Sequence, residues 1–302
     1  MATPFLSIVI PVLNREKIVV RTLDSVAAQS LDDFELIVVD NGSTDNTRQV
    51  IEEWIENHPK ILARLVEEPE KGAARARNRG LDEAKGEWTM FFDSDDTMHS
   101  DLVEEIRRNA DGADIVAWNV TIHQLDGTSI RQKSFAKRVL FHTIFNGNFA
   151  TQRYAARTAL FRKVGGWNAA LRGWDDTELG VRLALSSPAI RLLKGTKVDV
   201  YAQEESITGV RHAADTTKWE EALEVMKKHL EAASMAKAAR WIDLRRAILA
   251  GQYSAEGNET ESQRLISAVI ADFKSKRWLY RFACRYTAAR HRGAARLLGW
   301  LC

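Results

Sequence analysis

Short apolar runs alternate with amphipathic segments over the first two thirds of the chain. Runs that suit buried strands lie at residues 6–12, 34–39, 63–67, 88–92, 113–120 and 192–201. Between them, apolar side chains recur at helical spacing, as in Val19, Leu23 and Val26, and again in Ile51 and Trp54. Strands that alternate with helices indicate βαβ units. The pattern therefore predicts an α/β fold with a mostly parallel sheet flanked by helices.

Two further features refine this organisation. Asp126-Gly127 predicts a hairpin turn between strands at 121–124 and 128–132. After about residue 212 the strand signals stop, and helical segments rich in Ala, Leu, Lys and Arg run to the end. We therefore expect an α/β domain over residues 1–212 and a helical C-terminal region over residues 213–302.

The amino-acid composition excludes several classes of protein. The 302 residues carry 43 Lys+Arg against 41 Asp+Glu, which is too balanced for a dedicated nucleic-acid binder. The only cysteines, Cys284 and Cys302, cannot form a disulfide framework or a multi-cysteine metal cluster. No apolar stretch reaches the ~18 residues of a membrane span. Together these features predict a protein of the reducing cytoplasm.

The end of the sequence is strongly basic. From Lys274 onward it holds eight Lys and Arg residues and no Asp or Glu, with Trp278, Phe282 and Trp300 interleaved. Such a segment can lie as an amphipathic helix on an anionic membrane, here the inner face of the cell membrane. Equally, its apolar face can pack on the protein while its arginines are solvated. The sequence leaves both interpretations open.

Three carboxylates, Asp93, Asp95 and Asp96, follow the strand at 88–92 with Ser94 between them. In open α/β sheets, ligands bind beyond the carboxyl ends of the strands. Carboxylates so close repel each other, and a divalent cation removes that cost. Mg²⁺ takes one or two carboxylates together with substrate phosphates. The alternative is a solvated acidic turn, with Asp96 capping a helix.

Two more segments present polar groups near strand ends. Asp40 and Asn41 close the second strand, at a turn into a helix where free backbone N–H groups face a ligand. Arginines at every second position from Arg75 to Arg79 span more than one helix face, and Arg suits bidentate phosphate contact. Helix capping and a solvated helix surface are the alternatives. We keep Arg77 and Asn78 as candidate ligand contacts.

A later acidic pair, Asp175-Asp176, follows Trp174 and opens a helix. Carboxylates stabilise a helix N-terminus electrostatically, which can be their whole role. The functional alternative is a general base beside an acceptor hydroxyl.

In order and spacing, these motifs resemble the inverting family 2 glycosyltransferases, which have a GT-A fold built on a Rossmann-like sheet. The resemblance spans roughly residues 5–208 and rests on the segments at 7–14, 38–45, 72–80, 86–96, 165–166 and 175–176.

The resemblance implies a nucleotide-sugar donor, commonly a UDP-sugar, and a divalent cation, Mn²⁺ or Mg²⁺. It places Pro11 and Asn14 in the first nucleotide-contacting loop. The remaining implied nucleotide contacts are Asp40, Asn41, Arg77, Asn78, Asp93 and Ser94. Asp93 and Asp95 match the family's DxD motif, with Asp95 as the main metal ligand and Asp93 on the metal or the ribose. Asn41 stands where an acid is usual, so dTDP- and GDP-sugars stay open as donors.

Asp176 matches the family's catalytic base, and Asp175 stands where Glu is usual. Trp174, Asp96 and His212 are further candidates near the site. The implied reaction is a single displacement with inversion, onto a glycan or lipid-linked glycan acceptor in surface-glycan assembly.

Three rival functions are disfavoured by the sequence. A catalytically silent binding or scaffold subunit would be expected to lack Asp95 or Asp176, and both are present. A sugar nucleotidyltransferase usually has a glycine-rich N-terminal loop, whereas residues 10–14 contain no glycine. A dinucleotide-binding dehydrogenase is disfavoured because no G-x-G-x-x-G follows the first strand.

Overall fold

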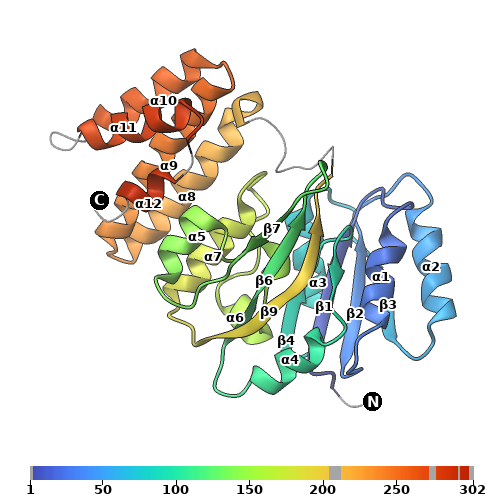
Figure 1. The fold of residues 1–302 in the computed structure, drawn as a ribbon. Helices are drawn as coiled ribbons and strands as arrows, with labels where there is room; N and C mark the ends of the chain where they lie inside the picture. The colour runs from blue at the N-terminus through green and yellow to red at the C-terminus, as the bar shows by residue number, and fades with distance from the viewer. Residues whose placement is uncertain (1–2, 204–211, 272–276, 292, 299–302) are drawn as a thin grey trace. The chain divides into compact units, whose positions relative to one another are not determined.

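A computed structural model describes residues 3–203, 212–271, 277–291 and 293–298 (Figure 1). Its contacts divide the chain into two compact units. The first comprises Met1–Lys137, Asn148–Ala170 and Ser186–Glu204; the second comprises Arg138–Gly147, Leu171–Leu185 and Glu205–Cys302. This division differs from the boundary expected near residue 212, because two earlier segments share a core with the C-terminal helices.

In the part of the chain that the structure describes, the first unit contains a nine-stranded sheet with the order β3-β2-β1-β4-β8-β6-β9-β5, and β7 beside β6. Its strands are β1 (Leu6–Val12), β2 (Phe34–Asp40), β3 (Leu62–Glu67), β4 (Trp88–Phe91), β5 (Thr97–Met98), β6 (Ile115–His123), β7 (Ser129–Gln132), β8 (Tyr154–Arg157) and β9 (Ile190–Tyr201). Strands β1 to β4 are parallel, as predicted. The rest is mixed, because β8 runs antiparallel to both β4 and β6, and β5 and β7 are antiparallel to their partners.

Helices cover both faces of this sheet (Figure 1). They are α1 (Val19–Ala27), α2 (Thr47–Asn57), α3 (Ala73–Glu83), α4 (Leu102–Asn109) and α6 (Thr158–Lys163), with a 3₁₀ turn η1 (Thr151–Arg153). The predicted βαβ alternation of the N-terminal part is confirmed. The predicted hairpin is also present, although the segments at 113–120 and 121–124 form one strand, β6.

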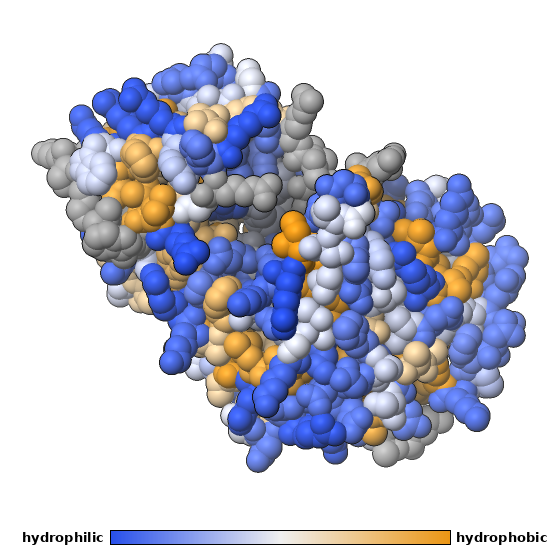
Figure 2. Space-filling view, in the orientation of Figure 1, coloured by the Kyte–Doolittle hydropathy of each residue, from blue (hydrophilic) through white to orange (hydrophobic). Residues whose placement is uncertain are grey.

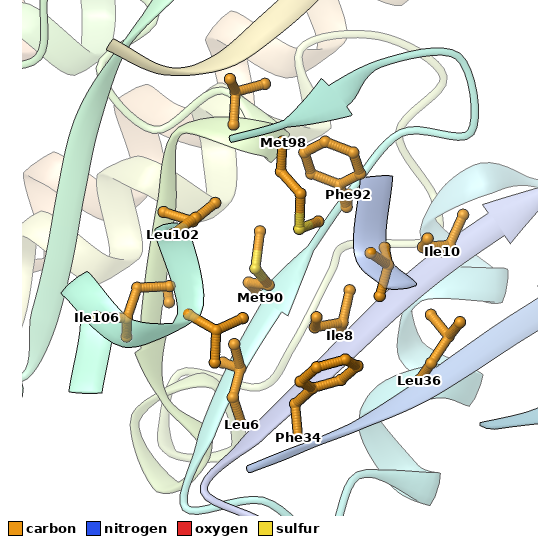
Figure 3. Packing of buried hydrophobic residues seen from close by; sticks show 14 of the residues in the cluster. Leu6, Ile8, Ile10, Phe34, Leu36, Met90, Phe92, Met98, Leu102 and Ile106 are labelled. Atoms are coloured by element: carbon orange, nitrogen blue, oxygen red, sulfur yellow. The ribbon is translucent and has the colours of Figure 1, made fainter. Parts of the chain in front are cut away.

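The main core lies on one face of the sheet (Figure 3). Strand side chains alternate between faces, so Leu6, Ile8 and Ile10 of β1 point into this core, where Leu102 and Ile106 of α4 meet them. The intervening side chains point to the other face, which α3 covers. There the backbone packs so closely that a Cβ on Gly80 would lie 2.2 Å from Val9 Cγ1.

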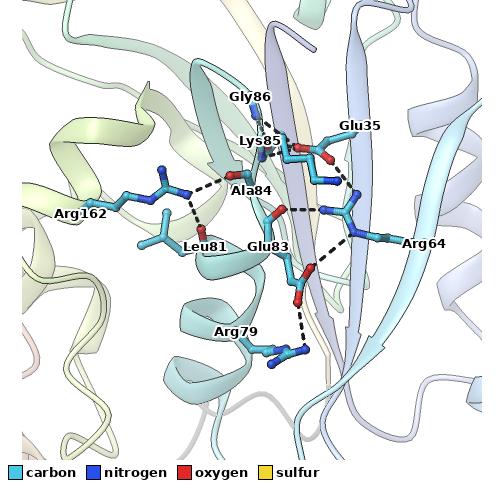
Figure 4. Close-up of polar contacts among 10 residues, drawn as sticks. Glu35, Arg64, Arg79, Leu81, Glu83, Ala84, Lys85, Gly86 and Arg162 are labelled. Atoms are coloured by element: carbon cyan, nitrogen blue, oxygen red, sulfur yellow. Dashed lines mark hydrogen bonds and ion pairs between the residues drawn. The ribbon is translucent and has the colours of Figure 1, made fainter. Parts of the chain in front are cut away.

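A buried carboxylate fixes the amino ends of the strands (Figure 4). Glu35 is fully buried and accepts hydrogen bonds from Ser7 Oγ at 2.6 Å, Arg64 Nη1 at 2.7 Å and the Lys85 N–H at 2.6 Å. Burial opposes its charge, but these donors outweigh burial and hold the pKa of Glu35 below its usual value. Arg64 also reaches the Glu83 carbonyl at 2.6 Å, so the network ties β2, β3 and the end of α3 together.

We expect Glu35→Gln to lower the free energy of unfolding by about 2 kcal/mol at neutral pH, because charge-assisted bonds become neutral ones. A lowered folded-state pKa stabilises the fold above the unfolded-state pKa of 4.5, and that contribution is lost as pH falls through the folded-state pKa. Urea unfolding of both proteins across this range measures the difference. A constant difference down to the lowest pH would show that the charge of Glu35 is not its source.

The second unit is helical. It contains α5 (Val139–Asn146), α7 (Asp175–Leu185), α8 (Thr216–Ala232), α9 (Ala236–Ala255), α10 (Glu259–Ala271), α11 (Arg277–Ala288), α12 (Ala294–Leu298) and a 3₁₀ turn η2 (His212–Ala214). Helix α9 is extensively buried and contributes Leu244, Ile248 and Tyr253 to a separate core. The predicted C-terminal helical extension is confirmed. Within the described ranges, no helix is both long and apolar enough to span a membrane.

Candidate active site

The carboxyl ends of three parallel strands meet at one edge of the sheet. Val12 pairs with Asp40 across β1 and β2, and Val9 pairs with Phe91 across β1 and β4. The loops that leave these strands carry most of the predicted nucleotide and metal ligands. The register therefore brings segments around residues 14, 41 and 93 to the same edge, where a ligand of this fold class binds.

Asp93 and Asp95 are partly exposed at this edge, with Ser94 buried between them. Asp93 Oδ1 lies 3.1 Å from Arg77 Nη2. Burial, and then the neighbouring Asp93 carboxylate, raise the pKa of Asp95, while Arg15 and Arg21 oppose this shift. Arg21 also donates to the Asp95 carbonyl at 2.5 Å. The site thus concentrates negative charge that the protein neutralises only in part.

Asp96 has a different environment from the other two acids. It is 2% exposed, and its carboxylate accepts hydrogen bonds from the Tyr201 N–H at 3.0 Å and from Gln152 Nε2 at 2.9 Å. Burial, with the charges of Asp93 and Asp95, raises the pKa of Asp96 to about 8. Through these contacts Asp96 connects the acidic loop, residues 93–96, to η1 and β9. The alternative of Asp96 as a helix cap is wrong, because α4 begins later, at Leu102.

Arg77 is 8% exposed although it carries a charge. Its guanidinium lies over the Trp167 ring, 4.5 Å from the centroid. Asn78 holds that tryptophan in place: Nδ2 donates to the Trp167 carbonyl at 2.8 Å, and Oδ1 accepts from the Trp167 N–H at 2.8 Å. Asn78 thus uses both ends of its amide on protein backbone. It positions Trp167, and through it Arg77, beside Asp93.

The other two arginines of α3 face the surface, as the sequence favoured. Arg75 pairs with Glu70 at 2.6 Å, and Arg79 pairs with Glu83 at 2.9 Å. Exposed pairs of this kind contribute little to stability, so these side chains have an ordinary solvated role.

The side-chain amide of Asn41 also forms hydrogen bonds with the protein backbone. It is 3% exposed, donates to the Glu68 and Glu70 carbonyls at 2.9 and 2.8 Å, and accepts from the Gly72 N–H at 2.7 Å. Its side chain thereby fixes the loop from β3 to α3. Only the second lone pair of Oδ1 remains for a nucleotide base. The neighbouring Asp40 is buried too, and accepts from the Ser43 N–H at 3.1 Å.

Pro11 and Asn14 do not share a loop. Pro11 lies inside β1, opposite Val39, so its predicted position in the loop is wrong, whereas its contact with the nucleotide stays a prediction. Asn14 does lie in the loop, with a φ of 53° that Asn tolerates better than most residues. Its Oδ1 accepts from the Thr44 N–H at 2.8 Å, which joins the loop after β1 to the loop after β2.

The donor set suits a hard divalent cation that also binds substrate. No cluster of three or more His, Cys, Asp or Glu side chains forms a ready metal cage among the residues described here. Such a cage is not required, since Mg²⁺ and Mn²⁺ are commonly held by one or two carboxylates and the phosphates of a nucleotide. Burial, and then the Asp93 carboxylate, raise the pKa of Asp95, and a cation bound there would offset both effects. Asp95 and Asp93 therefore fit the implied metal.

Asp175 and Asp176 belong to the second unit, in the first turn of α7. Asp176 Oδ1 accepts from the Thr177 N–H at 2.6 Å. The helix is anchored one turn later by Glu178, which is 1% exposed and bonds Arg182 at 2.6 Å and His229 at 2.8 Å. A carboxylate at this N-terminus is stabilised by the helix dipole.

Trp174 and His212 come together in this second unit. Their ring centroids lie 6.1 Å apart, and both contact Trp219 at 5.0 Å. Burial lowers the pKa of His212, and Glu256 opposes that shift. Trp174 has a φ of 50°, a conformation that bulky residues rarely adopt. The aromatic cluster holds this conformation immediately before Asp175.

No role was predicted from the sequence for two residues that lie near Asp93 and Asp95, Arg21 and Trp167. Arg21 lies on the amphipathic α1, where a single cationic residue gives no signal. Trp167 follows the Gly165-Gly166 pair used for the resemblance, and a Cβ on Gly166 would lie 2.7 Å from Asn78 Oδ1. That glycine was the available clue to a close contact with Asn78.

Comparison with known proteins adds to this geometry. A PGL/p-HBAD biosynthesis glycosyltransferase of Mycobacterium bovis BCG is 31% identical over 196 residues, 63% of this chain and 73% of that protein. The structure of S. aureus TarS 1-349 in complex with UDP-GlcNAc matches with a TM-score of 0.68 at 20% identity, over 98% of this chain and 92% of that one. The mannosyltransferase PcManGT from Pyrobaculum calidifontis, in complex with GDP-Man and Mn2+, matches with a TM-score of 0.57 at 20% identity, over 99% and 88%.

The two structural matches confirm the predicted GT-A fold. The sequence model described as Glycosyl transferase family 2 matches residues 7–175, more than half of the chain and all of the strand-end loops described above. The chain belongs to glycosyl transferase family 2.

Proposed function

We propose that this glycosyltransferase moves a hexosyl group from a UDP-sugar to an acceptor hydroxyl with inversion, and that a divalent cation is required. The observation that carries the proposal is the group of Arg77, Asp93 and Asp95 at the strand ends. It offers a cationic side chain and two crowded carboxylates to a diphosphate and its metal. The choice of a UDP-sugar over dTDP- and GDP-sugars is supported by the complex of TarS with UDP-GlcNAc.

The residues have distinct tasks in this reaction. Asp95, with Asp93, would hold the cation, which would supply positive charge that stabilises the leaving diphosphate. Arg77 adds a fixed positive charge, positioned by Trp167 and Asn78. The resemblance assigns the base to Asp176, which takes the proton of the acceptor hydroxyl. The acceptor oxygen then bonds to the anomeric carbon as the bond from that carbon to the diphosphate oxygen breaks, so the configuration inverts.

The acceptor we propose is a glycan or a lipid-linked glycan in surface-glycan assembly. This acceptor class follows from the family resemblance. Since both Asp95 and Asp176 are retained, an active enzyme is favoured over a scaffold subunit.

A thermal-shift panel tests the donor site. UDP, dTDP, GDP and their sugars are each added with and without Mn²⁺. We expect UDP to raise the Tm by about 5 °C at a ligand concentration ~100 times Kd, and only in the presence of metal. Stabilisation by GDP alone would overturn the base assignment, and equal shifts without Mn²⁺ would overturn the metal requirement.

A further inference from the structure

Among the described residues, the buried side chains of helix α11 lie on one face of the helix. Leu279, Tyr280, Ala283 and Cys284 are buried on it and belong to the helical core. The contact with α9 is tight, since a Cβ on Gly251 would lie 2.3 Å from the Cys284 carbonyl oxygen. The expectation that the apolar face of the basic C-terminal segment packs on the protein is therefore confirmed for α11.

The opposite face of α11 carries side chains that the core does not use. Trp278 is 61% exposed, and Phe282, one turn later, is 45% exposed. Arg277, Arg281 and Arg285 are exposed as well. At about 100° per residue, the three arginines form one row and the two aromatic side chains form the next, both away from the buried face. Figure 2 shows hydrophobic surface among hydrophilic side chains on the visible face of this unit.

The charge of this region has one sign. From residue 273 to the end, the sequence contains eight Lys and Arg residues and no Asp or Glu. Lys274, Lys276, Arg292 and Trp300 lie outside the described residues, so the structural argument rests on α11 and α12. There, Arg296 and Leu297 are exposed too, with Leu297 at 50%. The surface therefore combines exposed apolar side chains with a local excess of positive charge along the same helices.

We propose that this face of α11, defined by Arg277, Trp278, Arg281, Phe282 and Arg285, rests on an anionic lipid bilayer. Aromatic side chains sit well at the boundary between headgroups and acyl chains, and arginines beside them pair with lipid phosphates. A second copy of the chain fits this face poorly. In a symmetric dimer the same patch would meet itself and bring the three arginines of each copy into one interface.

Vesicle flotation with the full chain tests the proposal. We expect binding to phosphatidylcholine vesicles that contain phosphatidylglycerol, little binding to phosphatidylcholine alone, and weaker binding as salt rises. Replacing all three arginines by Gln should reduce the partition coefficient ~100-fold, at about fivefold for each charge near the surface. Replacing Trp278 and Phe282 by Ala should also weaken binding, with less dependence on salt.

Matched variants control for total charge and for total apolar surface. Lys60, Lys163 and Lys194 are exposed in the first unit, and changing them to Gln removes the same charge. Leu125→Ala removes a side chain that is 67% exposed. Neither control should alter flotation. Equal losses in the controls, equal binding to neutral vesicles, or a dimer in light scattering that the Trp278 and Phe282 changes abolish, would each overturn the proposal. Nucleotide-induced Tm shifts report separately on the donor site.

Discussion

Asp95→Asn is expected to abolish the metal-dependent part of nucleotide-sugar binding, with a loss in affinity of at least ~100-fold. The amide keeps the size of the side chain but removes the negative charge that would hold the cation. A divalent cation held by Asp95 would contribute several kcal/mol, so its loss would be large compared with the loss of one hydrogen bond. Isothermal titration of UDP with and without Mn²⁺ measures the effect.

The same substitution should leave the fold intact. In the metal-free chain, burial and the Asp93 carboxylate oppose the charge of Asp95 and raise its pKa. A raised carboxyl pKa lowers stability as pH rises above 3.8, so removing the charge should keep or increase the Tm near neutral pH. Asp82→Asn, an exposed change on α3, is the matched control and should bind the nucleotide as wild type does. Wild-type affinity in Asp95→Asn would remove Asp95 as a metal ligand.

The sequence was sufficient for features that depend on local pattern. Continuous apolar runs in β1 and β2 reflect burial on both faces of a parallel sheet, and this signal does not need a partner to be recognised. Strand β8 gave no such signal. Its four residues, Tyr154–Arg157, are too few for a period, and the strand is defined by its antiparallel pairing with β4 and β6.

Residue roles were harder to predict than residue positions. Arg77 and Asn78 were both expected to contact ligand, yet Asn78 bonds the backbone of Trp167, 89 residues later in the chain. The amide of Asn41 is similarly committed to carbonyls of the loop that precedes α3. An amide that binds a ligand and an amide that clamps a distant loop look the same in sequence. Only the tertiary partner distinguishes them.

The roles of the three acids in and beside the DxD motif were likewise not predictable from sequence alone. Sequence spacing groups Asp93, Asp95 and Asp96 as potential metal ligands, and their separation requires knowledge of burial. Asp96 is enclosed by donors from η1 and β9, whereas Asp93 and Asp95 remain partly exposed. The proposed ligand set is thereby reduced to the two partly exposed acids, Asp93 and Asp95.

Asp176→Asn is expected to lower kcat about 10²- to 10⁴-fold, the usual contribution of a general base, while UDP affinity stays within about twofold. The amide keeps the shape of the side chain at the start of α7 and can still accept the bond from the Thr177 N–H. It cannot take a proton from the acceptor. Initial rates of sugar transfer and titration of UDP on the same preparation separate the two effects.

The neighbouring acid supplies the matched control. Asp175 lies in the same first turn of α7, so Asp175→Asn makes the same change in charge at the helix N-terminus. If helix electrostatics were the main role of the pair, both variants would lose similar stability and similar activity. A base at Asp176 instead predicts a large loss of kcat in Asp176→Asn alone, together with loss of the acidic limb of the pH–rate profile. Normal turnover in Asp176→Asn would exclude Asp176 as the base and leave the donor site, tested through Asp95, unaffected.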